Sequence, residues 1–183
     1  DVVIGEFDSW RSKEAQTVRD DAFSAGQVPI LRHHYADAVK MVAAAHAQLK
    51  LAEVADAFTE GQGEVCIVVK DGDIWLRSLV DWIVDPKLCY DLKTTGGSVA
   101  PHVIGIKAVD DGWDIQAAMQ ERILNLLHPE MTGRRRFRFI AQENAPPYAL
   151  VVVELSESFM TMAGPAQPVE SRAAFGKAGL GAI

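Results

Sequence analysis

The hexapeptide Tyr-Asp-Leu-Lys-Thr-Thr occupies residues 90–95 and is the most informative part of this chain. In a β-strand, successive side chains point to opposite faces of the sheet. Asp91 and Lys93 therefore share one face, while Tyr90 and Leu92 share the other. The hexapeptide predicts a strand with one apolar face and one face that presents a carboxylate beside an ammonium group.

Two more carboxylates lie upstream, in segments that are also strand-like. Asp81 follows an apolar stretch, and Glu64 precedes a run of β-branched residues. If these strands are neighbours in one sheet, both acids join Asp91 in an all-oxygen cluster of the kind that binds Mg²⁺ or Mn²⁺. Such a metal lowers the pKa of a bound water and polarises a phosphate, and Lys93 could orient that water or stabilise negative charge. The cluster predicts metal-assisted hydrolysis of phosphodiesters.

A simpler interpretation competes with this one. An Asp-x-Lys pair on a strand is common, and it usually marks a solvated face with a weak surface ion pair. The neighbouring residues favour the functional interpretation: Asp81 lies on the preceding strand, two glycines follow Thr94 and Thr95, and Gln116 and Gln120 stand one turn apart on a predicted helix.

The remaining pattern predicts a mixed α/β layer fold. Strands are expected over residues 64–70, 74–84, 88–94, 136–142 and 148–155, with the Asp71-Gly72 pair forming a hairpin between the first two. Helices are expected over residues 8–25, 35–58, as one helix or two, and 113–127, the last ending before Pro129. His102 is expected in a loop after the third strand.

Composition bounds the domain organisation and the setting. A chain of 183 residues with 49% hydrophobic residues can bury one core, so we expect one domain over residues 1–163 and a poorly ordered tail over 164–183. No apolar run is long enough to cross a bilayer, and Cys66 and Cys89 are expected to be small core residues of a cytoplasmic protein. The net charge of −7 argues against a protein that coats nucleic acid, so any DNA contact is expected to be local.

Several motifs, taken in order, resemble one nuclease family. Residues 91–95, Asp-Leu-Lys-Thr-Thr, resemble the Asp-x-Lys-Thr-Thr motif of RecE-like and RecB-like nucleases, with Asp81 in the place of that family's preceding metal-binding aspartate. Residues 113–119, Trp-Asp-Ile-Gln-Ala-Ala-Met, resemble its helix motif, and residues 139–148 resemble its closing pair of strands. Over roughly residues 5–160 the chain resembles the PD-(D/E)XK nuclease superfamily, and within it the exonuclease VIII (RecE-like) phage-associated exonucleases.

The resemblance implies a restriction-endonuclease-like core with a mixed central sheet flanked by helices. It implies Asp81 and Asp91 as metal ligands, Lys93 as the catalytic lysine and Gln116 as a residue near the scissile phosphate, with Glu64 as a further acidic ligand. The implied activity is a Mg²⁺-dependent DNA exonuclease, with Mn²⁺ able to substitute, acting on double-stranded ends in phage or prophage recombination within a bacterial cell. A single-strand annealing protein and a homo-oligomeric ring are the implied partners.

Two departures from the family pattern support an alternative. The family's helix motif carries a Tyr where this chain has Gln120, and the family's upstream metal-binding His has no match in this sequence. The alternative is a catalytically weakened nuclease fold that acts as a DNA-binding or assembly module. A small-molecule hydrolase or transferase is less supported, because the chain has neither a Gly-rich phosphate loop nor a nucleophile elbow.

A basic run, Arg134-Arg135-Arg136, stands at the start of a predicted strand in this acidic chain. It is expected to contact phosphates of DNA, together with Thr94, Thr95 and Gln120. A solvated basic strand edge that discourages aggregation is an equally good interpretation of the run. His33 and His34 are expected to be exposed.

Overall fold

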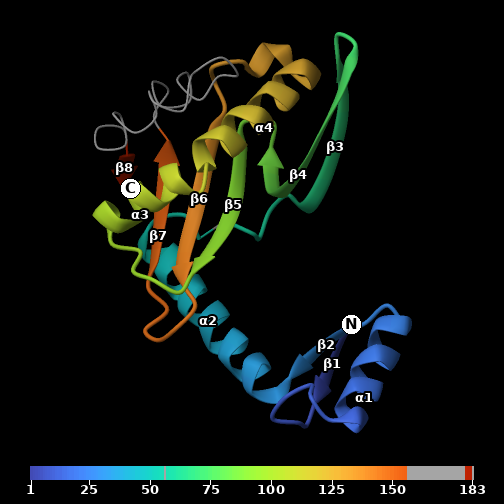
Figure 1. The fold of residues 1–183 in the computed structure, drawn as a ribbon. Coiled ribbons are helices and arrows are strands. Elements are labelled where there is room, and N and C mark those ends of the chain that lie inside the picture. Colours follow the sequence, from blue (N-terminus) through green and yellow to red (C-terminus); the bar gives the residue numbers. More distant parts are fainter. Residues whose placement is uncertain (56, 156–179, 183) are drawn as a thin grey trace. The chain divides into compact units, whose positions relative to one another are not determined.

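The computed structural model describes residues 1–55, 57–155 and 180–182 (Figure 1). Residue contacts divide the chain into two compact units, Asp1–Ala44 and Ala45–Ile183, so the domain predicted over residues 1–163 runs across both. Most of the predicted tail, residues 164–179 and 183, lies outside the described residues. Within the described part of the chain, no helix is long and apolar enough to span a membrane.

The first unit is a helix beside a small parallel sheet. Strands β1 (Val2–Gly5) and β2 (Val28–Leu31) pair in parallel, and helix α1 (Lys13–Ser24) connects them. The helix begins at Ser12, whose Oγ accepts a hydrogen bond from the Ala15 amide at 3.1 Å. The helix predicted within residues 8–25 is confirmed, whereas these two four-residue strands were not predicted, because they are too short to show an alternating pattern.

Helix α2 (Arg32–Leu51) has 20 residues and contains neither Gly nor Pro. It begins three residues before the predicted start and ends seven residues before the predicted end. The segment after it leaves helical geometry, since Glu53 and Phe58 both adopt left-handed backbone angles. Both His33 and His34 are exposed on the first turn, as predicted.

The second unit is built on one mixed sheet. Its strands are β3 (Gln62–Asp71), β4 (Ile74–Asp85), β5 (Leu88–Thr95), β6 (Arg136–Glu143), β7 (Leu150–Leu155) and β8 (Leu180–Ala182), in that spatial order. Only β5 and β6 pair in parallel, and the other neighbours are antiparallel. The parallel step needs a crossover, which is made by α3 (Pro101–Asp110), α4 (Trp113–Leu127) and the short helix η1 (Pro129–Met131). The predicted fold class, a mixed sheet flanked by helices, is confirmed (Figure 1).

Apolar side chains cover both faces of this sheet. On one face, α3 and α4 pack over the strands, and Trp113 stacks on Phe139 with ring centroids 5.0 Å apart. On the other face, Leu49 from the end of α2 packs with Tyr90, Ile140 and Val152 of the central strands. The central parts of β5 and β6 are therefore packed on both sides, although Leu92, Thr94 and Arg136 are exposed.

Two predictions from the sequence were wrong. His102 lies in helix α3 and not in a loop, because Pro101 fits the first position of a helix, where its missing N–H is not needed. Cys66 is exposed, since its neighbours Val65 and Ile67 point toward the sheet's core and alternation turns Cys66 outward. Cys89, by contrast, is fully buried as predicted.

Candidate active site

The site begins where strands β4 and β5 separate. Their ladder pairs Trp82 with Tyr90 and Ile83 with Cys89, but it does not continue past Trp82 toward the hairpin. At the next position the Leu92 amide donates to Oδ2 of Asp81 at 2.9 Å, so a carboxylate replaces the missing backbone acceptor. The parting of the strands thus places the Asp81 carboxylate beside the residue that follows Asp91.

Asp91, Lys93 and Gln116 form a closed triangle of polar contacts on the face covered by α4. The Gln116 side-chain amide donates to Oδ1 of Asp91, and Nζ of Lys93 donates to Oε1 of Gln116 at 2.8 Å. Nζ of Lys93 also lies 2.6 Å from Oδ2 of Asp91. Alternation along β5 brings the acid and the base to one face, as predicted, and α4 supplies the amide that joins them.

Asp91 is a buried carboxylate with only 1% of its surface exposed. Burial raises its pKa, and the nearby charge of Asp81 raises it further, while the hydrogen bond and charge of Lys93 act in the opposite direction. Its Oδ2 atom accepts no hydrogen bond of good geometry from the described residues, although Lys93 lies within ion-pair distance. Two negative groups in a partly dry site create a place where a cation is stabilised, and the Lys93 ammonium group lies there against Oδ2 of Asp91.

The donor set fits Mg²⁺ in one of its usual forms. In proteins Mg²⁺ retains several waters and binds through one or two carboxylates together with substrate phosphates. Asp81 and Asp91 supply two such carboxylates. No three His, Cys, Asp or Glu side chains come together as a metal site among the residues that the structure describes.

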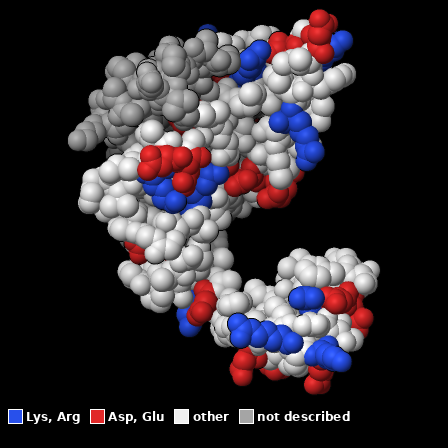
Figure 2. Space-filling model, viewed as in Figure 1, with Lys and Arg blue, Asp and Glu red and all other residues white. Residues whose placement is uncertain are grey.

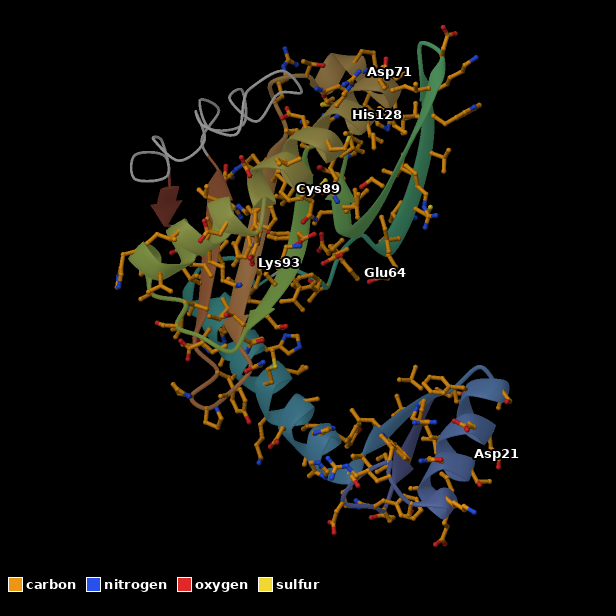
Figure 3. The ribbon with its side chains drawn as sticks, in the orientation of Figure 1. Asp21, Glu64, Asp71, Cys89, Lys93 and His128 are labelled. Carbon is orange, nitrogen blue, oxygen red and sulfur yellow. The ribbon has the colours of Figure 1, made fainter. Side chains whose placement is uncertain are left out.

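Glu64 takes a position next to this pair. Its neighbours Gly63 and Val65 pair with Trp82 and Val80, so Glu64 lies across from Asp81 in the β3–β4 hairpin. It is exposed, with a left-handed φ of 54°, at the base of the hairpin (Figure 3). The structure therefore brings Glu64 to the neighbouring strand without closing a group of three carboxylates.

Gln120 is buried and ties α4 to β4. Its Nε2 donates to the Leu79 carbonyl at 3.2 Å, beyond the point where β4 leaves β5. Only 3% of Gln120 is exposed, so this side chain holds the two elements together beneath the surface and does not face solvent. The family resemblance predicts a Tyr at this position. This chain has a Gln there, and its side chain makes a buried contact between α4 and β4.

Thr94 and Thr95 differ in their surroundings. Thr94 is exposed, whereas Thr95 is buried and its Oγ1 accepts a hydrogen bond from the Gly97 amide at 3.1 Å. Thr95 therefore shapes the turn after β5, and Thr94 is exposed on the face of β5 opposite to Asp91 and Lys93.

The basic run lies away from the triangle. In the parallel pairing of β5 and β6, Arg136 lies beside Leu88 while Lys93 lies beside Ala141, a separation of five residues or about 16 Å of strand. Arg136 forms two hydrogen bonds with Glu154, at 2.9 and 2.7 Å. Arg134 and Arg136 are both exposed, and Arg136 is the one that is paired with Glu154.

Arg135 connects three parts of the protein through its guanidinium group. It donates to the Pro86 carbonyl at 2.7 Å, to the Leu124 carbonyl at 3.4 Å and to the side chain of Asn125. These contacts join the β4–β5 turn to the end of α4. The arrangement indicates a structural role for Arg135.

We therefore expect Arg135→Ala to lower the free energy of unfolding by about 1–3 kcal/mol, since it leaves two carbonyls and an amide without their donor. Urea denaturation measures this change, and Arg134→Ala is the matched control that should leave the midpoint unaltered. An Arg135→Ala protein that is as stable as the parent but binds DNA poorly would contradict the structural role.

Sequence reasoning did not single out Trp75 or Arg77 on β4. Both are exposed, and they lie on the same strand as Asp81. Strict alternation through residues 65–79 was the signal that could have found them, because it assigns one side of the hairpin to the core and the other to solvent.

The fold and the site together define a mixed α/β protein with a carboxylate–lysine–amide centre at the parting of two strands. The chain matches no protein-family model and no curated protein. It is similar in structure to a protein from Eubacterium rectale described as a "putative exonuclease", with a TM-score of 0.57 and 14% sequence identity. The similarity covers 82% of this chain and 55% of the other, so this chain spans about half of that protein's length. At this identity the similarity shows a shared fold.

Proposed function

We propose that this chain is a Mg²⁺-dependent DNA exonuclease domain that hydrolyses phosphodiester bonds from double-stranded ends. The observation that carries the proposal is the triangle of Asp91, Lys93 and Gln116 beside Asp81. A structural neighbour described as an exonuclease supports a nuclease, and the motif order supports a PD-(D/E)XK enzyme of the RecE-like kind.

Each residue of the site has a defined task in this proposal. Asp81 and Asp91 would hold the metal, which when bound supplies a Lewis acid and lowers the pKa of a coordinated water. Lys93 keeps a positive charge beside Asp91, where negative charge develops on the phosphate during hydrolysis. Gln116 fixes the direction of both side chains, because its amide group donates to Asp91 and accepts from Lys93. Glu64 is the further acid at the edge of the site.

The wider setting follows from the same proposal. A DNA end in phage or prophage recombination, in the cytoplasm of a bacterial host, is the expected substrate, and a single-strand annealing protein is the expected partner. Assembly into a homo-oligomeric ring is the proposed oligomeric state. Among the proposed DNA contacts, Arg134, Arg136 and Thr94 have exposed side chains, and Arg136 is paired with Glu154.

A second candidate is a nuclease fold that binds DNA without cleaving it. Two observations favour it: the described residues contain no group of three metal-ligating side chains, and Gln120 is buried where the family has a Tyr. This candidate predicts DNA binding that is independent of metal and no loss of substrate.

Digestion of end-labelled linear duplex DNA, beside a covalently closed circle, distinguishes the two candidates. With Mg²⁺ we expect release of nucleotides from the linear form alone, and with excess chelator no release, because the water must be activated by the metal. Binding to DNA without cleavage in either buffer would support the second candidate. Equal cleavage of the closed circle would contradict an exonuclease that needs an end.

A further inference from the structure

The β3–β4 hairpin has two chemically different faces. On the inner face, Ile67 and Val80 are buried in the core beneath α4, and Arg122 of α4 forms an ion pair with Asp71 near the hairpin tip. The opposite side is called here the outer face; it consists of three cross-strand pairs, Cys66 with Leu79, Val68 with Arg77, and Lys70 with Trp75. All six side chains of the outer face are exposed.

The outer face combines an aromatic ring with uncommitted positive charge. Trp75 is 68% exposed, which is unusual for the largest apolar side chain. Neither Lys70 nor Arg77 forms a side-chain hydrogen bond or an ion pair with any described residue. Figure 2 shows both basic and acidic side chains on the side of the second unit where Figure 1 places the hairpin, with acidic ones at its tip. Lys70 lies directly across from the exposed ring of Trp75, and Arg77 lies two residues further along β4. Such a surface is suited to stacking on the ring and to binding anions.

We propose that the outer face binds single-stranded nucleic acid, with a base stacked on Trp75 and phosphates held by Lys70 and Arg77. This inference rests on the proposed function, because the outer face belongs to the strand that also carries Asp81. Arg77 precedes Asp81 by four residues, which is about 13 Å of strand. Aromatic stacking with neighbouring cations is the usual way in which proteins hold unpaired bases without reading their sequence.

The charge balance favours this partner over another protein. The chain has a net charge of −7, and Arg122 on α4 and Arg136 and Arg138 on β6 are neutralised by carboxylates, whereas Arg134 pairs with no acid among the described residues. Lys70 and Arg77 pair with no acid among the described residues. Two such cations beside an exposed ring match a polyanion that carries flat bases. A second copy of this chain also carries a net negative charge, but nothing in its binding would require an exposed aromatic ring for stacking.

Cys66 provides a reporter on the same face. It is exposed, whereas Cys89 is buried and has its pKa raised to about 12, mainly by burial. Because the thiolate is the reactive form, a thiol reagent at neutral pH should modify Cys66 and leave Cys89 unmodified. A bound strand should then slow the alkylation of Cys66.

The experiment measures binding of a fluorescent oligothymidylate in chelator, which stops cleavage, for the parent, Trp75→Ala, Trp75→Phe and Arg77→Ser. Trp75→Ala should raise the Kd about tenfold or more, and Trp75→Phe should recover part of that loss. Arg77→Ser should reduce the magnitude of the slope of the logarithm of the binding constant against the logarithm of the salt concentration by about 0.7. Lys50→Ala is the control for loss of an exposed charge, and thermal melting checks that each variant is folded.

The outcomes separate this inference from the proposed function. Unchanged Kd values in all hairpin variants, in a protein that digests linear DNA, would overturn the inference alone. Binding that weakens as expected, in a protein that never cleaves, would support the inference and overturn the exonuclease. A parent protein that binds no oligothymidylate would overturn the inference, as would a Trp75→Ala variant that alters only self-association.

Discussion

Asp91→Asn should reduce metal-dependent cleavage of DNA by about three orders of magnitude, because it removes a carboxylate that the metal requires. Asparagine has nearly the same shape and keeps an oxygen that can accept the hydrogen bond from Gln116. The loss should therefore reflect missing charge and not a misplaced helix. Initial rates of nucleotide release from linear duplex measure it, with Asp110→Asn, an exposed acid on α3, as the control of equal charge change.

The same substitution should not destabilise the fold. Burial raises the pKa of Asp91 in the folded protein above its ordinary value. A raised pKa means that folding favours the protonated acid. The contribution of Asp91 to stability is therefore fully present below the pKa of the unfolded chain, and it is lost as pH rises through the pKa of the folded protein. Above the folded pKa the charge on Asp91 lowers the free energy of unfolding, and Asp91→Asn removes that effect.

Urea denaturation at several pH values tests this linkage. The variant should be as stable as the parent or more stable near pH 8, and its advantage should shrink as pH falls toward about 4. Inactivity together with a large loss of stability at neutral pH would indicate that Asp91 is needed for folding, and an active Asp91→Asn protein would remove Asp91 from the site.

Much of the sheet was predictable from local patterns. Residues 64–70 and 74–84 alternate around an Asp71-Gly72 turn, and both strands of the hairpin appear within a few residues of their predicted limits. The parallel pairing of β5 with β6 was not predictable, because it joins residues nearly fifty apart and depends on how α3 and α4 pack. Helix α3 was missed since it has ten residues, includes Gly105 and follows a glycine-containing loop.

The candidate site was predictable as a set of residues but not as a set of contacts. Alternation alone put Asp91 and Lys93 on one face, whereas the hydrogen bonds from Gln116 depend on the distance between α4 and β5. The arginine run shows the limit more clearly. The sequence shows three adjacent charges, and only the fold shows that Arg135 binds carbonyls and that Arg136 meets a glutamate eighteen residues away.

Gln120 illustrates the same limit on a single helix. Its place one turn after Gln116 suggested a shared polar surface, yet Gln116 is only partly buried and Gln120 is almost fully buried. The difference arises because β4 has left β5 at this point and offers the Leu79 carbonyl to α4. Because the strands separate at the site, the Leu79 carbonyl is free to accept from Gln120. Gln120 is therefore buried, although a DNA contact was expected at its position.

Lys93→Ala should reduce cleavage by about a hundredfold to a thousandfold while leaving the metal site intact. Lys93 is not a metal ligand; its Nζ lies against Oδ2 of Asp91 and donates to Gln116. Removing the ammonium group removes the positive charge near the reacting phosphate, but both carboxylates remain. A loss of rate without a loss of metal affinity is therefore the signature expected of this residue.

Calorimetric titration with Mg²⁺, beside the cleavage assay, separates the two kinds of residue. Asp91→Asn should weaken both metal binding and cleavage, whereas Lys93→Ala should weaken cleavage alone, with Lys50→Ala as the control for a lost exposed lysine. Lys93 also lowers the pKa of Asp91, so in Lys93→Ala that carboxyl should stay protonated to higher pH and metal binding should begin at higher pH than in the parent. If Lys93→Ala instead loses metal at every pH, the ammonium group serves to position Asp91, and the charge that assists hydrolysis must come from another side chain.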